Sequence, residues 1–464
     1  MHGRFKDSGG YGESVTVLAF VIGIVLLVVG LAVSIALHEI GHLVPAKKFG
    51  VHVGQYMVGF GPTLFSRTVG ETQYGIKAFP LGGYISMSGM YPPSPAEREA
   101  QAAGTAAPAA RASGRFFAAM VQDARLANEE TLIAGRDRVF YLLPVWKRVV
   151  IMLGGPLMNL LLAIVLFAIL FSGIGVQTAS TTVASITQCV LPADTTQTAC
   201  EPGDPATPAA EAGFAPGDTI RSIDGTAVST FDETSAIIQA NPGRALDVVI
   251  TRDGADQTLT LTPVLAERPV YDENDNPVTD AAGTPVTQDV GFAGIGPASV
   301  LTPQPIWAGP QAAVENVGAV FGIIAQLPVK VYQTAESLFT GADRDPNGPL
   351  SVVGVGVIAG DVAASESPIL NRVAGFLGLL ASLNIALFAF NLIPLLPLDG
   401  GHVVVALWGG LKNVWAKLRH RPPPPPVDAT RLVPLTFIVV ILLVVMGGIL
   451  IVADLINPVS IFGP

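Results

Sequence analysis

The chain has 464 residues, of which 50% are hydrophobic and only 13% are charged, and its mean hydropathy is +0.53. Ordinary soluble proteins carry about 25% charged residues, so this composition indicates a membrane protein with a modest soluble part. The 26 basic and 36 acidic side chains give a net charge of −10, which excludes a nucleic-acid-binding or disordered chain. Two cysteines are too few for a disulfide scaffold or a cysteine-based metal cluster.

Four stretches of the chain are long and apolar enough to cross a bilayer, which takes about 20 residues. The first, Val15–Leu37, has no charged residue and is not followed by the small-residue cleavage site of a signal peptide. We therefore predict a polytopic α-helical membrane protein with four transmembrane helices and both termini on one side. The predicted transmembrane segments cover residues 15–46, 146–175, 369–402 and 431–456.

Basic residues predict the orientation of these helices. The loops after the first and third spans carry Lys and Arg close to their membrane ends, whereas the long middle segment has its basic residues far from the spans. Because such residues favour the cytoplasmic side, we expect residues 91–145 and 403–430 in the cytoplasm and the middle segment and both termini outside. Arg4, Lys6 and Arg372 oppose this bias.

The soluble segments contain two β-rich parts. Residues 53–90, where Gly and aromatic residues alternate with Val and Ile, read as short strands and predict a membrane-associated β-region. Residues 91–145 are rich in Ala, Pro and Arg and are expected to be partly disordered. In the middle segment, residues 180–265 alternate strand patterns with an Asp224–Gly225 turn. These residues resemble an α+β PDZ domain of the bacterial type.

PDZ domains bind extended peptides at a sheet edge, but a spacer or size filter is an equally open reading of this module. Cys189 and Cys200 lie at its start, where an oxidising location favours a disulfide and two free thiols are the alternative. Residues 266–368 are expected to be extracytoplasmic or to lie on the membrane surface. Within them, Ala313–Leu327 and Val329–Phe339 predict two amphipathic helices.

The first span ends in the sequence HEIGH, which supplies His38, Glu39 and His42. Positions i and i+4 share one face of a helix, so both imidazoles can bind one zinc ion, with Glu39 beside it as a base. Zinc needs a third protein ligand. Asp399, which ends the third apolar stretch after two helix-breaking prolines, is the candidate. His402 could also bind zinc but fits an interfacial or capping role better.

These motifs together resemble the site-2 protease family of intramembrane zinc metalloproteases. The resemblance rests on HEIGH and on the run NLIPLLPLDGG from Asn391 to Gly401, in this order. It is supported by four shorter matches, which are GFGP at 59–62, PLGGY at 80–84, GGPLMN at 154–159 and GPLS at 348–351. It implies that His38, His42 and Asp399 hold zinc and that Glu39 is the catalytic base. It also implies that Asn391 and Asn384 hold the substrate or the oxyanion.

The resemblance further implies a function and a place in the cell. It implies hydrolysis of peptide bonds in transmembrane segments of single-span proteins already trimmed on their outer side, such as anti-sigma factors. The enzyme would be a multi-pass protein of the bacterial inner membrane, with its active site toward the cytoplasm and membrane lipids around it. Well-known members carry two PDZ domains. The single PDZ domain and Ala-rich, acidic composition found here look more like the actinobacterial branch.

Two other readings stay open on the sequence alone. A non-catalytic membrane scaffold, with a PDZ domain that binds peptides and a purely structural His–Glu cluster, predicts no stoichiometric zinc. A different membrane metalloprotease, with a glutamate as third ligand, predicts that Asp399→Asn retains zinc. The zinc content of the purified protein and of ligand variants therefore distinguishes all three.

Overall fold

The computed structural model describes residues 9–93, 137–190, 200–270, 278–279, 286–341, 344–345 and 348–458. It has two compact units, a mainly helical one made of Met1–Gly173 and Pro305–Pro464 and a β-rich one made of Ile174–Gln304. Most of the cytoplasmic loop that we expect to be partly disordered, residues 94–136, lies outside the described residues.

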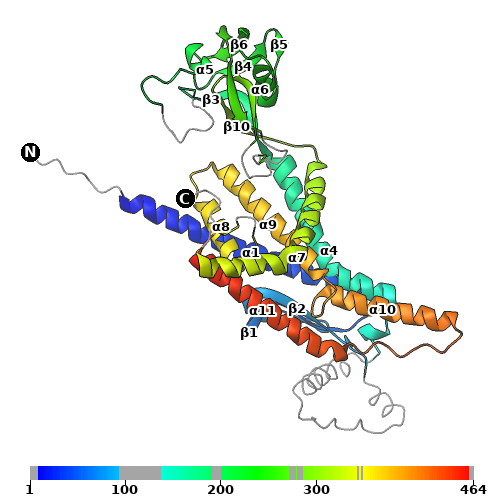
Figure 1. Cartoon of the computed structure of the whole chain (residues 1–464). Coiled ribbons are helices and arrows are strands. Elements are labelled where there is room, and N and C mark those ends of the chain that lie inside the picture. The colour runs from blue at the N-terminus through cyan, green and yellow to red at the C-terminus, as the bar shows by residue number, and fades with distance from the viewer. Residues whose placement is uncertain are drawn as a thin grey trace, which may run out of the picture. The chain divides into compact units, whose positions relative to one another are not determined.

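In the described residues, the helical unit consists of seven longer helices and a bent hairpin (Figure 1). The elements are α1 (Gly9–Lys48), β1 (Val53–Val69), β2 (Thr72–Met87), α4 (Val145–Ala168), α7 (Ala308–Thr340), α8 (Val352–Ala364), α9 (Ile369–Asn391), α10 (Asp399–Leu418) and α11 (Val433–Ile456). Short 3-10 turns at Phe140–Leu142 and Ala429–Leu432 precede α4 and α11, and a π-helical turn at Ile169–Ile174 follows α4.

Among the described residues, five helices are long and apolar enough to cross a membrane, namely α1, α4, α7, α9 and α11. The additional candidate is α7, which runs for 33 residues through Pro328 where we expect two separate surface helices. Figure 1 shows this helix bent into two arms, as a proline inside a helix allows. The chain is thus a multi-pass membrane protein, and four spans stay a prediction.

The third predicted span, residues 369–402, is divided in the structure. α9 ends at Asn391, and Asp399 is the first residue of α10. α10 then continues to Leu418, so much of the predicted loop 403–430 is helical. Prolines in the connecting stretch disfavour continuous helix, which explains the break.

Small residues allow close helix packing around α1. A Cβ atom on Gly41 would lie 2.2 Å from the carbonyl oxygen of Gly154, so α1 and α4 touch through their backbones. α1 and α9 run in the same direction, because Gly30 packs against Leu380 and Asn384 donates a hydrogen bond to Ser34 one turn further on. α1 therefore packs mainly against α4 and α8 and meets α9 near Gly30 and Ser34.

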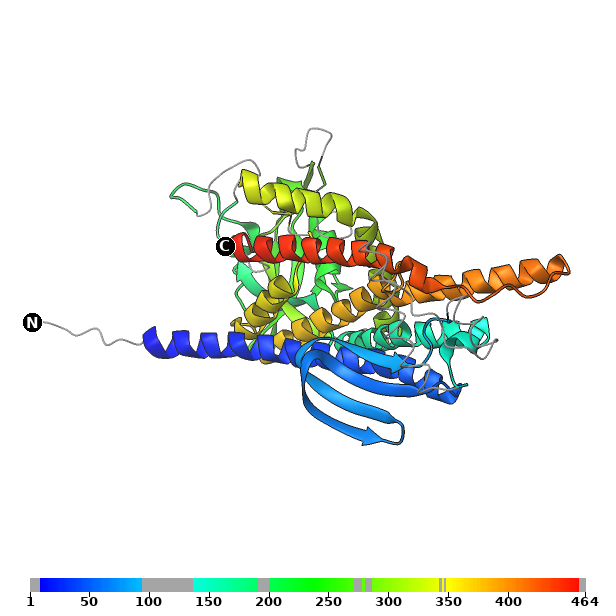
Figure 2. The ribbon, with the colours of Figure 1, turned by 90° about the horizontal axis from the view of Figure 1, so that it is seen from below.

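The β1–β2 hairpin lies against the second half of α1 (Figure 2). The first half of β1 pairs on both sides, since Met57 lies opposite Tyr84 on one side and Gly75 on the other. The Tyr56 hydroxyl donates to the carbonyl of Ala36 in α1 at 2.8 Å. Toward its tip the hairpin exposes large apolar side chains such as Phe65, which suits contact with lipid.

The β-rich unit has the strand order β10-β3-β4-β6-β7, with β5 on β4 and a separate β8–β9 hairpin. Its elements are β3 (Val176–Ile186), α5 (Pro208–Glu211), β4 (Thr219–Ile223), β5 (Thr226–Ala227), α6 (Phe231–Gln239), β6 (Leu246–Arg252), β7 (Ala255–Leu261), β8 (Val264–Pro269), β9 (Thr287–Phe292) and β10 (Ile295–Thr302). The unit extends beyond the predicted 180–265, because β9 and β10 complete it. A disulfide joins Cys189 and Cys200.

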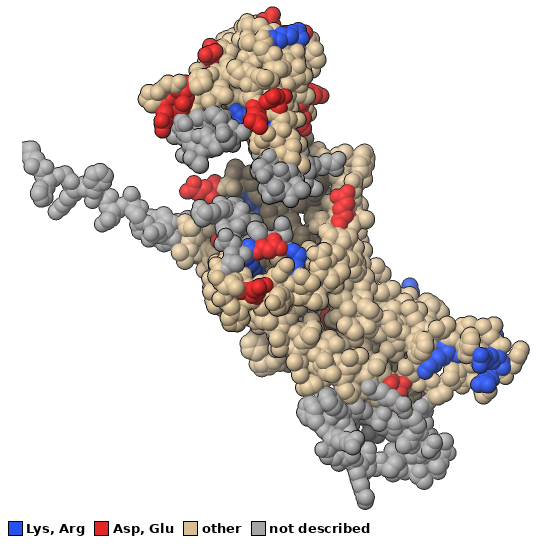
Figure 3. All heavy atoms as spheres, viewed as in Figure 1, with Lys and Arg blue, Asp and Glu red and all other residues tan. Residues whose placement is uncertain are grey.

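Charged side chains are sparse on the helices of the helical unit (Figure 3). Lys and Arg gather at the far end of α10, where Lys412, Lys417 and Arg419 are not buried. A broad apolar surface with a basic end is what a protein embedded in a bilayer presents.

Candidate metal centre

Helix α1 holds the first two candidate ligands on one face, four residues apart. The Nε2 atoms of His38 and His42 lie 3.2 Å apart. His42 donates through Nδ1 to the carbonyl oxygen of Ile151 in α4 at 2.7 Å. Because a carbonyl can only accept, this bond places the hydrogen on Nδ1 and leaves the Nε2 lone pair free for a metal.

The third candidate ligand comes from the start of α10. Asp399 Oδ2 lies 3.3 Å from Nε2 of His38 and 3.3 Å from Nε2 of His42. The connection from α9 folds back over this helix start, and a Cβ atom on Gly400 would lie 2.4 Å from the Leu392 carbonyl oxygen. A glycine is therefore required beside Asp399 for the carboxylate to reach α1.

The spacing of these three atoms fits zinc. Zinc bonds of about 2.0 Å in a tetrahedron place neighbouring ligand atoms about 3.3 Å apart, which matches the 3.2 to 3.3 Å found here. In the described part of the chain, Asp399 Oδ2 is buried and has no hydrogen bond. A buried carboxylate oxygen facing two imidazole nitrogens is explained by a shared cation.

Gly155 of α4 leaves open the space that a metal would fill. A Cβ atom on Gly155 would lie 2.2 Å from His42 Nε2 and 2.7 Å from His38 Nε2. Any side chain at this position would therefore crowd the two nitrogen atoms that a metal would bind. Gly155 belongs to the motif GGPLMN at 154–159, but the motif by itself does not indicate this role.

Glu39 lies beside the three candidate ligands and is 8% exposed. Gly83 of β2 packs against it, since a Cβ atom on Gly83 would lie 3.0 Å from the Glu39 Cγ atom. Glu39 therefore packs against the β1–β2 hairpin as well as standing next to His38 on α1.

The other predicted site residues lie at different places. Asn384 is fully buried and its Nδ2 donates to Ser34 Oγ and the Leu380 carbonyl. Asn391 is the last residue of α9 and its Nδ2 donates to the Leu387 carbonyl at 2.9 Å. The His402 ring lies beside that of Tyr91, with the centroids 6.3 Å apart and the planes tilted by 39°, and His402 does not belong to the described group of ligand atoms.

Asn159 is a further polar residue near the centre to which the sequence analysis assigns no role. It is 1% exposed, and both polar atoms of its amide lack a hydrogen bond within the described residues. It follows Gly155 by one helical turn, on the same face of α4. A polar residue in an apolar span is the sequence signal that could have identified it.

An apolar helix bundle that gathers two histidines, an aspartate and a buried glutamate defines a membrane zinc metalloprotease. Residues 26–430 match Peptidase family M50. The chain belongs to this family, the site-2 protease family, and is a zinc metalloprotease.

Several curated relatives are named as metalloproteases. Zinc metalloprotease Rip1 of Mycobacterium tuberculosis is 32% identical over 456 residues, which cover 96% of this chain and 100% of that protein. Rip1 of Mycolicibacterium smegmatis is 33% identical over 461 residues, with the same coverage. Metalloprotease MmpA of Caulobacter vibrioides is 27% identical over 412 residues, covering 84% of this chain and 86% of the relative.

Proposed function

We propose that His38, His42 and Asp399 hold the zinc ion and that Glu39 is the catalytic base for cleavage within the membrane. The observation that carries the proposal is the mutual spacing of 3.2 to 3.3 Å between the three ligand atoms. Bound zinc would acidify a water molecule and polarise the scissile carbonyl.

Glu39 would move the proton in this reaction. It follows His38 directly on α1 and lies in a site that excludes bulk water. Its carboxylate takes a proton from the attacking water and then delivers it to the nitrogen of the departing amine. Asn391, which ends α9 just before the connection to Asp399, is proposed to orient the substrate carbonyl. Asn384 would support it more remotely, from the interface with α1.

The β1–β2 hairpin is proposed to hold the substrate in an extended form. A transmembrane helix hides its peptide bonds, and once unwound its N–H and C=O groups need new partners. The stretch Gly83–Met87 of β2 pairs only with β1 among the described residues, so its other edge can pair with an added strand. This edge begins beside Glu39.

The β-rich unit is proposed to act as a PDZ domain. A cavity of about 360 Å³ lies between α6 and the Gly291–Ile295 stretch, beside the edge strand β10. Arg268 covers its Phe292 with the guanidinium carbon 3.7 Å from the ring centre. A peptide could add to β10 there, although the module could also exclude bulky proteins by size.

We propose the topology that the basic residues predict, with the β-rich unit and both termini outside the inner membrane of a bacterium and the metal centre toward the cytoplasm. The proposed substrates are single-span proteins trimmed on their outer side, such as anti-sigma factors. This substrate class follows from the family, and no residue of this chain specifies it.

Metal analysis and a cleavage assay test the site together. We expect one zinc per purified chain, and Glu39→Gln should keep that zinc while cleavage of a single-span test protein falls by at least a thousandfold. Asp399→Asn should lower the zinc content. A protein without zinc would favour the scaffold reading, whereas Asp399→Asn with full zinc would favour a glutamate as third ligand.

A further inference from the structure

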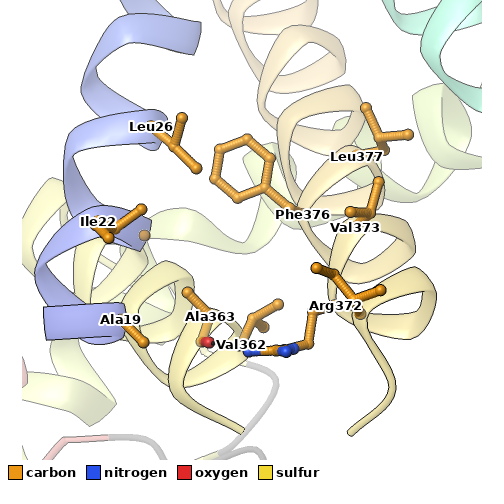
Figure 4. Close-up of a pocket in the computed structure, with 11 residues that line it drawn as sticks. Ala19, Ile22, Leu26, Val362, Ala363, Arg372, Val373, Phe376 and Leu377 are labelled. Carbon is orange, nitrogen blue, oxygen red and sulfur yellow. Dashed lines mark hydrogen bonds between the residues drawn. The ribbon is translucent and has the colours of Figure 1, made fainter. Parts of the chain in front are cut away.

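An apolar groove of about 360 Å³ lies between α1, α8 and α9, away from the metal centre (Figure 4). Ile22 and Leu26 of α1 line one side, and Val373 and Phe376 of α9 line the other. Ile22, Leu26 and Val373 are each about half exposed, so the groove is open to the bilayer around the bundle. Arg372 is the one charged residue among those that line it.

Arg372 extends from the first turn of α9 across one end of the groove to α8 (Figure 4). One of its N–H groups donates to the carbonyl oxygen of Ala363 at 2.9 Å. Its Nε atom is buried without a hydrogen bond, and in the described part of the chain no acidic side chain forms an ion pair with it. A guanidinium in a transmembrane segment is costly unless it pairs with an anion or with backbone carbonyl groups, and among the described residues Ala363 is the one such partner of Arg372.

The direction of the helices puts this cation at one end of the apolar surface. α1 and α9 run in parallel, as Gly30 meets Leu380 and Ser34 meets Asn384. The groove therefore follows both helices inward from Arg372 toward Leu26 and Phe376. The groove has the Arg372 cation at the end where α9 begins, and its apolar side chains line the part further along both helices. On the topology proposed above, that end faces the outer leaflet.

The chemistry of the groove favours a lipid. Its lining is apolar except for Arg372 at one end, which matches an anionic headgroup joined to a hydrocarbon chain. The long Arg372 side chain can reach toward headgroups from its place in α9.

We propose that this groove binds one acyl chain of a glycerophospholipid whose phosphate pairs with Arg372. The phosphate supplies the anion that the guanidinium lacks, through charge-assisted hydrogen bonds. The acyl chain covers the apolar side chains of α1 and α9.

Photo-labelling of the full chain tests this proposal. The protein is reconstituted in vesicles of phosphatidylethanolamine and phosphatidylglycerol that contain traces of phosphatidylethanolamine with a diazirine on its acyl chain. Labelled residues are then mapped by mass spectrometry. We expect saturable labelling within residues 19–26 and 369–377. Arg372→Gln should lower it at least fivefold, Arg372→Lys should retain most of it, and Ala19→Phe, which fills the groove, should remove it.

Three controls make the result specific. Arg421→Gln, which removes an exposed cation elsewhere, should leave labelling of the groove unchanged. Diacylglycerol with the same diazirine chain, which lacks a phosphate, should label the groove at least fivefold less. Zinc content should be equal in all variants, which shows that they fold. Labelling spread evenly over α1 and α11, or unaffected by Arg372→Gln, would overturn the proposal. The proposal would also be overturned if a substrate transmembrane segment crosslinked to the groove and prevented labelling by the lipid.

Discussion

Gly155 and His42 meet at the metal centre, where a Cβ atom on Gly155 would lie 2.2 Å from His42 Nε2. That distance is close to a zinc–nitrogen bond of about 2.0 Å, so an added methyl group would compete with the ion for one place. We expect Gly155→Ala to lower zinc affinity at least a hundredfold and to abolish proteolysis. Equilibrium dialysis with zinc, followed by metal analysis, measures this.

Gly447→Ala in α11 is the matched control, because nothing lies within 4 Å of the Cβ atom it would add. There the change from Gly to Ala in a helix should be neutral or raise stability by up to about 1 kcal/mol. Full zinc binding by Gly155→Ala would mean that the ion does not occupy the space between the two imidazoles and Asp399.

Asn159 is expected to position His38. α1 and α4 run in opposite directions, so the turn after Gly155 faces the turn of α1 that carries His38. The His38 Nδ1 atom is buried without a partner within the described residues, as is the Asn159 amide. We expect Asn159 to hold His38 directly or through one buried water, so that Asn159→Leu speeds zinc release about 10- to 100-fold.

Asn159→Asp can still accept the His38 N–H and should restore slow zinc release, which a merely structural role would not predict. Zinc transfer to a chromogenic chelator gives the rate, and the absorption spectrum of the cobalt-substituted protein reports the ligand geometry. An unchanged release rate in Asn159→Leu would show that His38 needs no support from α4.

Arg344 and Asp454 form a buried ion pair at the end of α11. Asp454 Oδ2 also accepts from the backbone N–H of Ser351 at 2.7 Å and of Gly354 at 3.2 Å, so it joins α11 to the start of α8. Asp454→Ala leaves the Arg344 charge unpaired and should cost about 3–5 kcal/mol. We expect the melting temperature in detergent to fall by about 5–10 °C.

A double variant separates loss of the pair from loss of packing at the same place. Arg344→Leu combined with Asp454→Leu removes both charges, and it should be more stable than Asp454→Ala alone. If the double variant and Asp454→Ala melt at the same temperature, the charge of Arg344 left without Asp454 is not the cause of the lost stability.

The β-rich unit should lose stability in acid through Asp218. Arg252 binds both carboxylate oxygens of this buried side chain at 2.6 Å, and these bonds hold the pKa of Asp218 below its usual value. A lowered pKa in the folded state stabilises the fold above the ordinary pKa of about 3.9. The contribution is lost as the pH falls below that value toward the lower folded pKa.

Arg252→Leu leaves Asp218 buried without its cation and should destabilise residues 174–304 by about 2–3 kcal/mol at pH 7. Urea unfolding of this segment at a series of pH values measures the difference. We expect the difference in free energy of unfolding between wild type and variant to become smaller below pH 4. A difference that stays constant down to pH 2 would show that protonation of Asp218 does not weaken its pair with Arg252.

Local patterns predicted much of this molecule. The apolar runs within the predicted segments 15–46 and 431–456 are helices because hydropathy over 20 residues is a local property. The spacing of His38 and His42 placed both rings on one face for the same reason. Pro328 was expected to separate two helices, and the structure instead keeps one bent helix, since a proline can bend a helix without ending it.

Contacts between segments that are far apart in the sequence could not be predicted from local patterns. Asp399 was selected as an acid after prolines, but only the fold brings it within 3.3 Å of both histidines. The space beside Gly155 and the place of Arg372 at the end of the groove depend on how α1, α4, α8 and α9 pack. The amino-acid sequence alone thus determined the helices and the chemistry of their side chains. The tertiary structure decided which of them meet, because backbone contacts such as Gly41 with Gly154 set the helix register.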